Sequence, residues 1–244
     1  MYWSLIRFGL ISFDMLYLWT INRNLSRAKI GCCNSFLACY ILSIQDNGDK
    51  PTMQKMKSLF IREQVGSKYL ATPEVEPECQ WVIDGEGVPT EKIDGTCCAI
   101  IDGVFYARHR VKTGKVVPDG WLHWSGYTEQ KTGHGWVPVG NGPEHKWHRE
   151  AWDALNLSQC NPPDGTYEMV GPKVQRNPCA LESHALWKHG LHLFSGANTP
   201  PRNFDGLREW LESNHVEGIV WHHPDGRMCK LKRRDFGIPW SGKE

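Results

Sequence analysis

Short runs of apolar residues alternate with clusters of glycine, proline and aspartate from residue 57 onward. Runs of this length between turn-forming residues are typical of β-strands. Two of them, 97–101 and 104–108, flank Asp102-Gly103. This arrangement predicts a β-hairpin, because aspartate and glycine tolerate the positive φ angles of tight turns. The pattern indicates a domain built mainly of antiparallel sheets.

Two segments have the periodicity of a helix instead. The first covers 148–157. The second begins near Asp205, which we expect to be its N-terminal cap, and ends at Asn214. Between these positions, apolar residues recur at i, i+3 and i+4, as on the buried face of a helix. Strands with a few flanking helices place the chain in the α+β class.

Residues 1–52 differ from the rest of the chain. They are rich in Leu, Ile, Phe and Trp, but Arg7 and Asp14 interrupt the apolar run. No uninterrupted stretch reaches the ~20 residues of a membrane-spanning helix, so we expect no membrane association. A signal or transit peptide is one alternative, and a true start at Met53 or Met56 is the one we favour. We therefore expect an atypical extension over 1–52 that is not part of the mature protein, and one domain over 53–244.

Composition narrows the classes of protein that fit. A net charge of +1 argues against a protein that coats nucleic acid, although a local basic patch would still bind phosphate. Nine cysteines without a Cys-x-x-Cys suit neither a disulfide framework nor a zinc ribbon, and they favour an intracellular, cytoplasmic protein with reduced thiols. The twelve tryptophans could stack on bases, but filling the core of a β-rich domain is their commoner use.

A second Asp-Gly pair, Asp225-Gly226, predicts another hairpin near the C-terminus. A two-residue turn there would pair Ile219 with Lys232, and alternation would then place Glu217, Lys230 and Lys232 on one face of the sheet. These side chains are either a solvated salt-bridge ladder or a site for a nucleoside triphosphate and a divalent cation. Ammonium groups bind phosphate oxygens, and a carboxylate binds the metal.

Lys92 lies directly before one of three Ile-Asp-Gly tripeptides, at 93–95. It is either an ordinary solvated lysine at a turn or a reactive amine. Lysine attacks as a neutral amine, and ammonium groups nearby at Lys230 and Lys232 would favour that form. A third segment, 165–171, carries Glu168 as a lone acid among apolar neighbours.

Taken in order, these segments resemble motifs I, III, IV and V of the covalent nucleotidyltransferases, which include polynucleotide ligases and mRNA capping enzymes. Longer strings are similar to the RNA ligase 1 family of ATP-dependent 5′-to-3′ RNA ligases, and the likeness spans roughly 57–240. The four motif segments are Lys92-Ile93-Asp94-Gly95, Tyr167-Glu168-Met169-Val170-Gly171, Glu217-Gly218-Ile219-Val220 and Lys230-Leu231-Lys232, and the longer strings are 89–98, 135–139, 191–193 and 217–222.

The resemblance implies an α+β nucleotidyltransferase (ATP-grasp-like) domain without a C-terminal OB domain. It implies a monomeric enzyme that transfers AMP from ATP to Lys92, then to an RNA 5′-phosphate, and joins that end to an RNA 3′-hydroxyl, in RNA repair. Glu217 and Glu168 would bind Mg²⁺, with Mn²⁺ as the alternative. The implied catalytic residues are Lys92, Lys230 and Lys232, and the implied nucleotide contacts are these three with Glu168 and either His192 or Phe194. We add Arg108 to the nucleotide contacts on the strand-pairing argument that follows.

One departure from the superfamily pattern concerns Cys97, which stands where many ligases carry an arginine. Strand pairing about Asp102-Gly103 would place Arg108 opposite Cys97, so we expect Arg108 to supply the guanidinium. For the residue that stacks on adenine, the strand register leaves His192 and Phe194 open. Two basic clusters are either solvated faces or RNA contacts: Arg108, His109, Arg110, Lys112 and Lys115, and Arg233 with Arg234.

Two other functions compete with an RNA ligase. A capping-type guanylyltransferase or a DNA ligase would share the lysine chemistry. A catalytically inactive nucleotide- or RNA-binding module would share only the fold. The presence of the lysine, both acids and both lysines of motif V argues against the inactive module.

Overall fold

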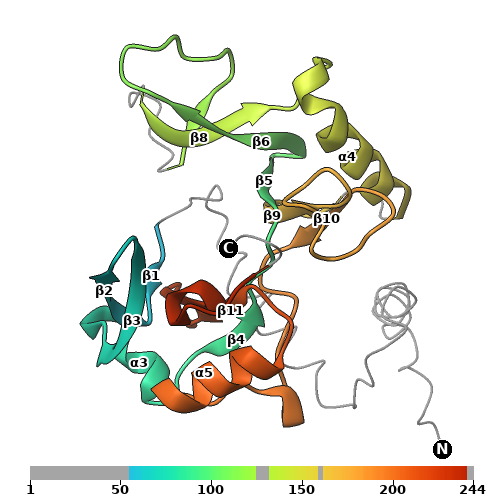
Figure 1. Ribbon diagram of the computed structural model, residues 1–244. Helices are drawn as coiled ribbons and strands as arrows, with labels where there is room; N and C mark the ends of the chain where they lie inside the picture. The colour runs from blue at the N-terminus through green and yellow to red at the C-terminus, as the bar shows by residue number, and fades with distance from the viewer. Residues whose placement is uncertain (1–54, 125–131, 159–161, 241–244) are drawn as a thin grey trace, which may run out of the picture. The chain divides into compact units, whose positions relative to one another are not determined.

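The computed structural model describes residues 55–124, 132–158 and 162–240 (Figure 1). These residues all belong to one compact unit, while the extension expected over 1–52 lies outside them. The described chain consists of mainly antiparallel strands with few helices, which confirms the α+β class. No helix in this part of the chain is long and apolar enough to cross a membrane. The ATP-grasp-like fold and the absence of an OB domain stay predictions.

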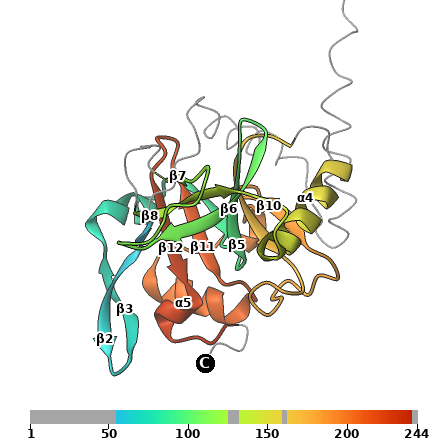
Figure 2. The same cartoon turned by 90° about the horizontal axis from the view of Figure 1, so that it is seen from above.

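The larger sheet has six antiparallel strands. Alternation along its strands gives the sheet two different faces: Cys98 and Ile100 pack in one apolar cluster with helix α4, and Cys97 and Ala99 lie in another cluster on the opposite face. Figure 2 shows α4 (Lys146–Ser158) beside this sheet. The order of strands is β10 (Ala185–Lys188), β9 (Gly165–Val170), β5 (Thr96–Ile101), β6 (Val104–Val111), β8 (Gly133–Pro138) and β7 (Leu122–His123).

The hairpin predicted at Asp102-Gly103 is confirmed. It joins β5 to β6, with Ile101 paired to Val104. Asp102 and Gly103 have φ angles of 53° and 71°. Two consecutive positive φ angles are those of a type I′ turn, whose twist suits a two-residue hairpin.

The smaller sheet has four strands, and helix α5 (Phe204–Ser213) covers it. Leu207 and Leu211 of α5 pack in one cluster with Ile219 and Leu231. The helical prediction for this segment is confirmed, but the cap is Asn203 rather than Asp205: the Asn203 side chain accepts a hydrogen bond from the Gly206 N–H. The order of strands is β1 (Lys57–Ser58), β12 (Met228–Lys232), β11 (Gly218–His222) and β4 (Val88–Glu91).

Shorter elements complete the described chain. Strand β1 is parallel to β12, and the chain then continues into a hairpin of its own. The remaining elements are β2 (Phe60–Val65), β3 (Lys68–Val75), α3 (Gln80–Ile83), and the 3₁₀ helices η1 (Pro77–Cys79), η2 (Pro143–His145), η3 (Gly196–Asn198) and η4 (Arg233–Phe236).

The register predicted for the C-terminal hairpin is wrong by one residue. Gly218, rather than Ile219, lies opposite Lys232. The turn has three residues instead of two, because the Gly226 N–H donates to the His223 carbonyl across a turn with Pro224 at its second position. Proline has the φ angle that this position requires, and Gly226, at φ 90°, closes the loop.

This correction changes how the charged residues are placed. Lys230 and Lys232 still share a face of β12, because they are two residues apart. Glu217 precedes β11, so the argument that put it on the same face through strand alternation is wrong. Its position has to come from contacts instead.

Candidate active site

The site lies where the chain passes from one sheet to the other. Residues 92–95 connect β4 of the four-stranded sheet to β5 of the six-stranded sheet. The backbone N–H of Lys92 donates to the Gly218 carbonyl at 2.9 Å. Its ammonium group donates to Glu217 Oε2 at 2.6 Å, and the side chains of Lys92 and Glu217 are only 20% and 12% exposed. The predicted nucleophile is thus fixed at both its backbone and its side chain.

Lys230 and Lys232 both lie within the electrostatic reach of Lys92. Burial, with Lys92 as the next cause, lowers the pKa of Lys230. Burial and then the charges of Lys92 and Arg234 lower the pKa of Lys232 to about 8. Glu217 acts on Lys232 in the opposite direction. The structure therefore brings together the four residues that we call the lysine cluster: Lys92, Glu217, Lys230 and Lys232.

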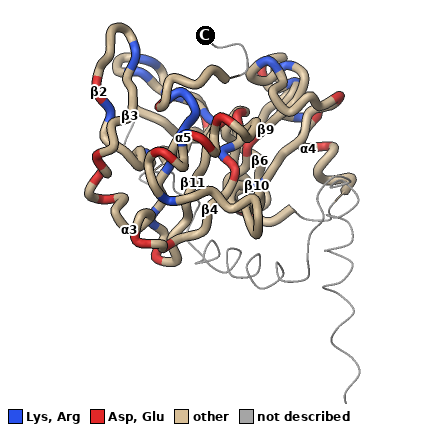
Figure 3. Tube along the Cα trace, turned by 60° about the horizontal axis from the view of Figure 1, so that its bottom comes forward, with Lys and Arg blue, Asp and Glu red and all other residues tan. Residues whose placement is uncertain are grey.

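The lysine cluster contains three ammonium groups and one carboxylate, which leaves an excess of positive charge. Figure 3 marks the charged residues along the trace, with both signs present around β11. Like charges in a partly buried place repel, and an anion such as a phosphate would relieve the repulsion. The lysine cluster is therefore suited to binding phosphate.

A second set of side chains crosses the six-stranded sheet. Glu168 pairs with Trp187 on one side and with Cys97 on the other. On β6 the next residue of the set is Arg108. Cys98 of β5 pairs with Ala107, and this register puts Arg108 beside Cys97. Paired residues in a sheet point to the same face. We call the set the cross-strand row; it takes one residue from each strand, Trp187, Glu168, Cys97, Arg108, Trp136 and Leu122.

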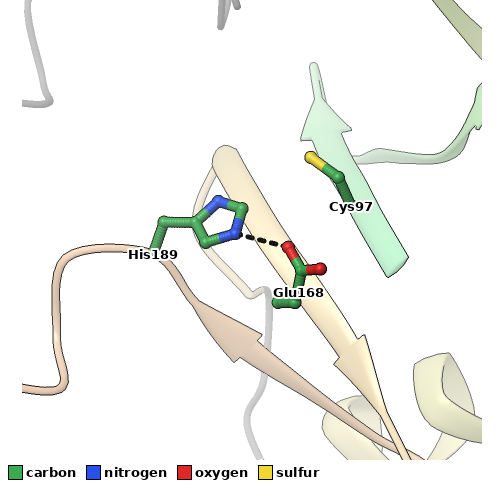
Figure 4. A group of neighbouring side chains, drawn as sticks. All are labelled: Cys97, Glu168 and His189. Carbon is green, nitrogen blue, oxygen red and sulfur yellow. Dashed lines mark hydrogen bonds and ion pairs between the residues drawn. The ribbon is translucent and has the colours of Figure 1, made fainter. Parts of the chain in front are cut away.

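Hydrogen bonds orient Glu168 at both carboxylate oxygens. The Gly95 N–H donates to Oε1 at 3.1 Å, and His189 Nε2 lies 2.8 Å from Oε2 (Figure 4). His189 Nδ1 lies 2.9 Å from the Thr166 hydroxyl. Because an ionised carboxylate only accepts, His189 donates from Nε2, and its Nδ1 accepts from Thr166 when the ring is neutral. Four residues thus hold one another in place.

Gly95 lets the loop of Lys92 reach this carboxylate. A Cβ atom at Gly95 would lie 2.3 Å from the Met169 carbonyl oxygen and 2.7 Å from Glu168 Cγ. Only glycine allows that approach of backbone to backbone. On the other side, the Trp240 indole N–H donates to Asp94 Oδ2 at 2.9 Å. The Ile-Asp-Gly tripeptide therefore ties the lysine cluster to the cross-strand row.

Cys97 and Arg108 lie next to each other in the row with different exposure. Burial, and then the charge of Glu168, raises the pKa of the Cys97 thiol, so the thiol is neutral. Arg108 is exposed, and its guanidinium lies over the Trp124 ring at 5.5 Å from the centroid. Arg108 borders the site, in the place that the hairpin predicted.

The two candidates for stacking on adenine have different surroundings. His192 lies next to the row, stacked on Trp187 with centroids 4.7 Å apart. Burial, and then His189, lowers the pKa of His192, which keeps the ring neutral. Phe194 is 7% exposed and packs edge-on against Trp210 of α5. The structure brings His192 to the site and places Phe194 in the core.

The basic clusters also separate. His109, Arg110, Lys112 and Lys115 are exposed on β6 and the turn after it. Arg233 instead donates to the carbonyls of Leu211 and Asn214 at the end of α5, which is a structural role.

Sequence reasoning missed His189, Thr166, Trp187 and Trp240. Thr166 lies two residues before Glu168 in a strand, so alternation alone would have put both on one face. His189 comes directly after β10, and only the pairing of β10 with β9 brings it to Glu168.

The chain is similar to known proteins over segments that include residues of both the lysine cluster and the cross-strand row. Residues 157–244 match the family model of RNA ligase 1, and this segment includes Glu168, Glu217, Lys230 and Lys232. RNA ligase 1 of Mus musculus is 26% identical over 73% of this chain and 76% of its own length. The Danio rerio protein of that name is 28% identical over 62% and 67%, and the Pongo abelii one is 25% identical over 73% and 76%. These matches confirm the resemblance to the RNA ligase 1 family.

Proposed function

From the likeness to the RNA ligase 1 family, we propose that this protein is an ATP-dependent RNA ligase. It joins an RNA 5′-phosphate to an RNA 3′-hydroxyl through a lysyl-AMP intermediate, and RNA repair is its role. The observation that carries the proposal is the lysine cluster: an amine paired with a carboxylate at 2.6 Å, with two further lysines of lowered pKa beside it.

In the first step, Lys92 acts as the nucleophile. Its amine attacks the α-phosphorus of ATP, a P–N bond forms, and the P–O bond to pyrophosphate breaks. The ammonium group must first lose a proton, and Glu217 is an acceptor at 2.6 Å. Lys230 and Lys232 neutralise the charge on the α-phosphate, and positioning with electrostatics carries most of phosphoryl-transfer catalysis.

The acidic residues fit a hard divalent cation. Carboxylate oxygens are the ligands that Mg²⁺ prefers, and Mn²⁺ accepts the same donors. Glu217 lies beside the lysines that would bind phosphate, so it is the better placed Mg²⁺ ligand, and Glu168 suits the ribose or the outer shell of the metal. When bound, the cation neutralises phosphate charge.

The cross-strand row serves the nucleoside. His192, flat and neutral on Trp187, offers an apolar surface to adenine. Arg108, at the edge of the row, is placed to contact the phosphates of ATP. The exposed residues Arg110, Lys112 and Lys115 continue from it and give RNA phosphates a path towards Lys92.

The remaining two steps consume the intermediate. AMP moves from Lys92 to the RNA 5′-phosphate, which becomes an activated diphosphate end. The 3′-hydroxyl of a second end then attacks that phosphate, and AMP leaves as the phosphodiester bond forms.

Labelling the protein with α-³²P nucleotides tests the first step. Wild type, Lys92→Ala and the exposed control Lys68→Ala are incubated with labelled ATP or GTP and Mg²⁺ and run on a denaturing gel. We expect label from ATP on wild type and Lys68→Ala and at least a ~1000-fold loss in Lys92→Ala, because the nucleophile is gone. Label from GTP instead would indicate a capping-type guanylyltransferase. Absence of label from both would indicate a binding module.

A further inference from the structure

A thiol, an imidazole and a carboxylate meet at the centre of the cross-strand row. The ligand atoms of Cys97, Glu168 and His189 all lie within 4.8 Å of one another (Figure 4). Cys97 and Glu168 are opposed in the pairing of β5 with β9, and His189 follows β10 on the far side of β9. Two of the three positions are thus fixed by strand register rather than by flexible loops.

Two of the three side chains, His189 and Glu168, already have the kind of hydrogen-bond partners that surround the ligands of a metal site. Histidine ligands usually bind a second group through their other ring nitrogen, and ligating carboxylates are themselves hydrogen-bonded. Here the Thr166 hydroxyl lies 2.9 Å from His189 Nδ1, and the Gly95 N–H donates to Glu168 Oε1. His189 Nε2 and Glu168 Oε2 remain directed at each other, next to the thiol.

We propose that Cys97, Glu168 and His189 bind one divalent cation of the zinc class. A sulfur, a nitrogen and an oxygen donor form a set that Zn²⁺ accepts, whereas Mg²⁺ requires oxygen donors. Three protein ligands leave a fourth position open for water or a ligand. This site differs in chemistry from the oxygen-only site proposed at Glu217.

The ion has a route to its ligands. The side chains of His189 and Glu168 are 26% and 13% exposed, so solvent reaches the two donors first. Cys97, 8% exposed, lies behind them as the third donor.

Binding of the ion changes the protonation of Cys97 and His189, and every proton is accounted for. The Cys97 thiol gives up its proton to solvent and becomes a thiolate ligand. His189 exchanges its Nε2 proton for one on Nδ1, which then donates to Thr166, so the ring stays neutral. Glu168 loses its hydrogen bond from His189 and gains a bond to the metal. One proton is released for each ion bound, with no redox change.

The consequence for activity rests on the proposed function. If the nucleotide binds over the cross-strand row, an ion at Cys97, Glu168 and His189 competes with it, because Glu168 cannot serve both. Micromolar Zn²⁺ would then inhibit self-adenylylation in the presence of excess Mg²⁺, and a chelator would restore it.

Titration of the full-length, metal-free protein with Co²⁺ tests the site without any use of its activity. Cobalt bound to a thiolate has a near-ultraviolet charge-transfer band that cobalt on oxygen and nitrogen donors lacks. We expect the band to saturate at one ion per chain in wild type. It should persist in the matched control Cys179→Ser, which removes a free thiol outside the trio.

Three variants decide the result. Cys97→Ser should lose the band, while His189→Gln should keep it with at least a ~10-fold lower affinity. Thr166→Val keeps all three ligands and should weaken binding by about 10-fold through the lost orientation of His189. A band that survives in Cys97→Ser, or no band in wild type at saturating Co²⁺, overturns the proposal. Zinc that binds without slowing adenylylation would refute only the competition with nucleotide.

Discussion

The lysine cluster and the cross-strand row lie on either side of one short loop, yet they differ in almost every physical respect. The cluster holds charged groups in partly buried positions, and burial, followed by the neighbouring cations, lowers the pKa of Lys230 and Lys232. Most of the row is neutral, with a protonated thiol at Cys97 and a neutral ring at His192 beside it. The first region suits phosphates, and the second suits a nucleoside or a soft ion. The contrast teaches that a nucleotide would be bound by two separate kinds of chemistry, joined at Gly95.

After the loss of the nucleophile itself, the largest effect should come from the acid of the lysine cluster. Glu217→Gln keeps a hydrogen-bond acceptor for Lys92 but removes the negative charge 2.6 Å from it. We expect at least a ~100-fold loss of self-adenylylation, because in the proposed mechanism this charge accepts the proton of Lys92 and binds a divalent cation. The measurement is the rate of lysyl-AMP formation under saturating ATP and Mg²⁺.

The exposed acid Glu209 on α5 is the matched control, since its substitution by Gln changes the same charge away from the site. If the two variants form lysyl-AMP at rates within threefold of each other, Glu217 has no catalytic role beyond that of an exposed surface acid.

The next effect should come from the edge of the row. Arg108→Ala removes the guanidinium for which we propose a contact with the nucleotide phosphates, and we expect a ~10- to 100-fold fall in kcat/KM for ATP in the adenylylation step. Arg227 is a close control, because its guanidinium also lies 5.5 Å from the centroid of a tryptophan ring, that of Trp81, while Arg108 has Trp124.

Comparison of Arg108→Ala with Arg227→Ala separates a nucleotide contact from a loss of cation–π packing. Equal kinetics in the two variants would contradict the role of Arg108 and would confine phosphate binding to the lysine cluster.

The two regions also differ in how far the sequence predicts them. The residues of the lysine cluster lie in short contiguous motifs, so their chemistry is visible before any pairing is known. Its geometry is less visible: the turn at Pro224-Asp225-Gly226 shifted the register of β11 on β12 by one residue, and Glu217 reached Lys92 through a contact rather than through alternation.

The row depends on the order of six strands, which a local pattern cannot give. The Asp102-Gly103 turn was enough to put Arg108 beside Cys97, because a type I′ hairpin fixes its own register. His189 was missed because it reaches Glu168 only through the pairing of β10 with β9. These strands are distant in the sequence from β5, and no local pattern predicts that they join its sheet. The choice between His192 and Phe194 stayed open for the same reason, because a motif position alone does not reveal that Phe194 packs against Trp210 of α5.

The smallest effect should be a change in the stability of the fold when one charge of the lysine cluster is removed. It tests whether the cluster is a place of unfavourable charge, unlike the mostly neutral row. Burial and the neighbouring cations lower the pKa of Lys232 from 10.5 to about 8, so at pH 7 the folded protein carries a charge there that destabilises it. Lys232→Met removes that charge and should raise the melting temperature at pH 7 by a few degrees. Between pH 8 and 10.5 the unfolded wild type binds more protons at Lys232 than the folded wild type does. Wild-type stability therefore rises with pH over this range, and the stability advantage of the variant should narrow.

Thermal melts of wild type and Lys232→Met from pH 7 to 10 measure this difference in stability. An advantage that is constant with pH would mean that the gain comes from packing of the methionine, and that Lys232 is no more strained than an ordinary surface lysine.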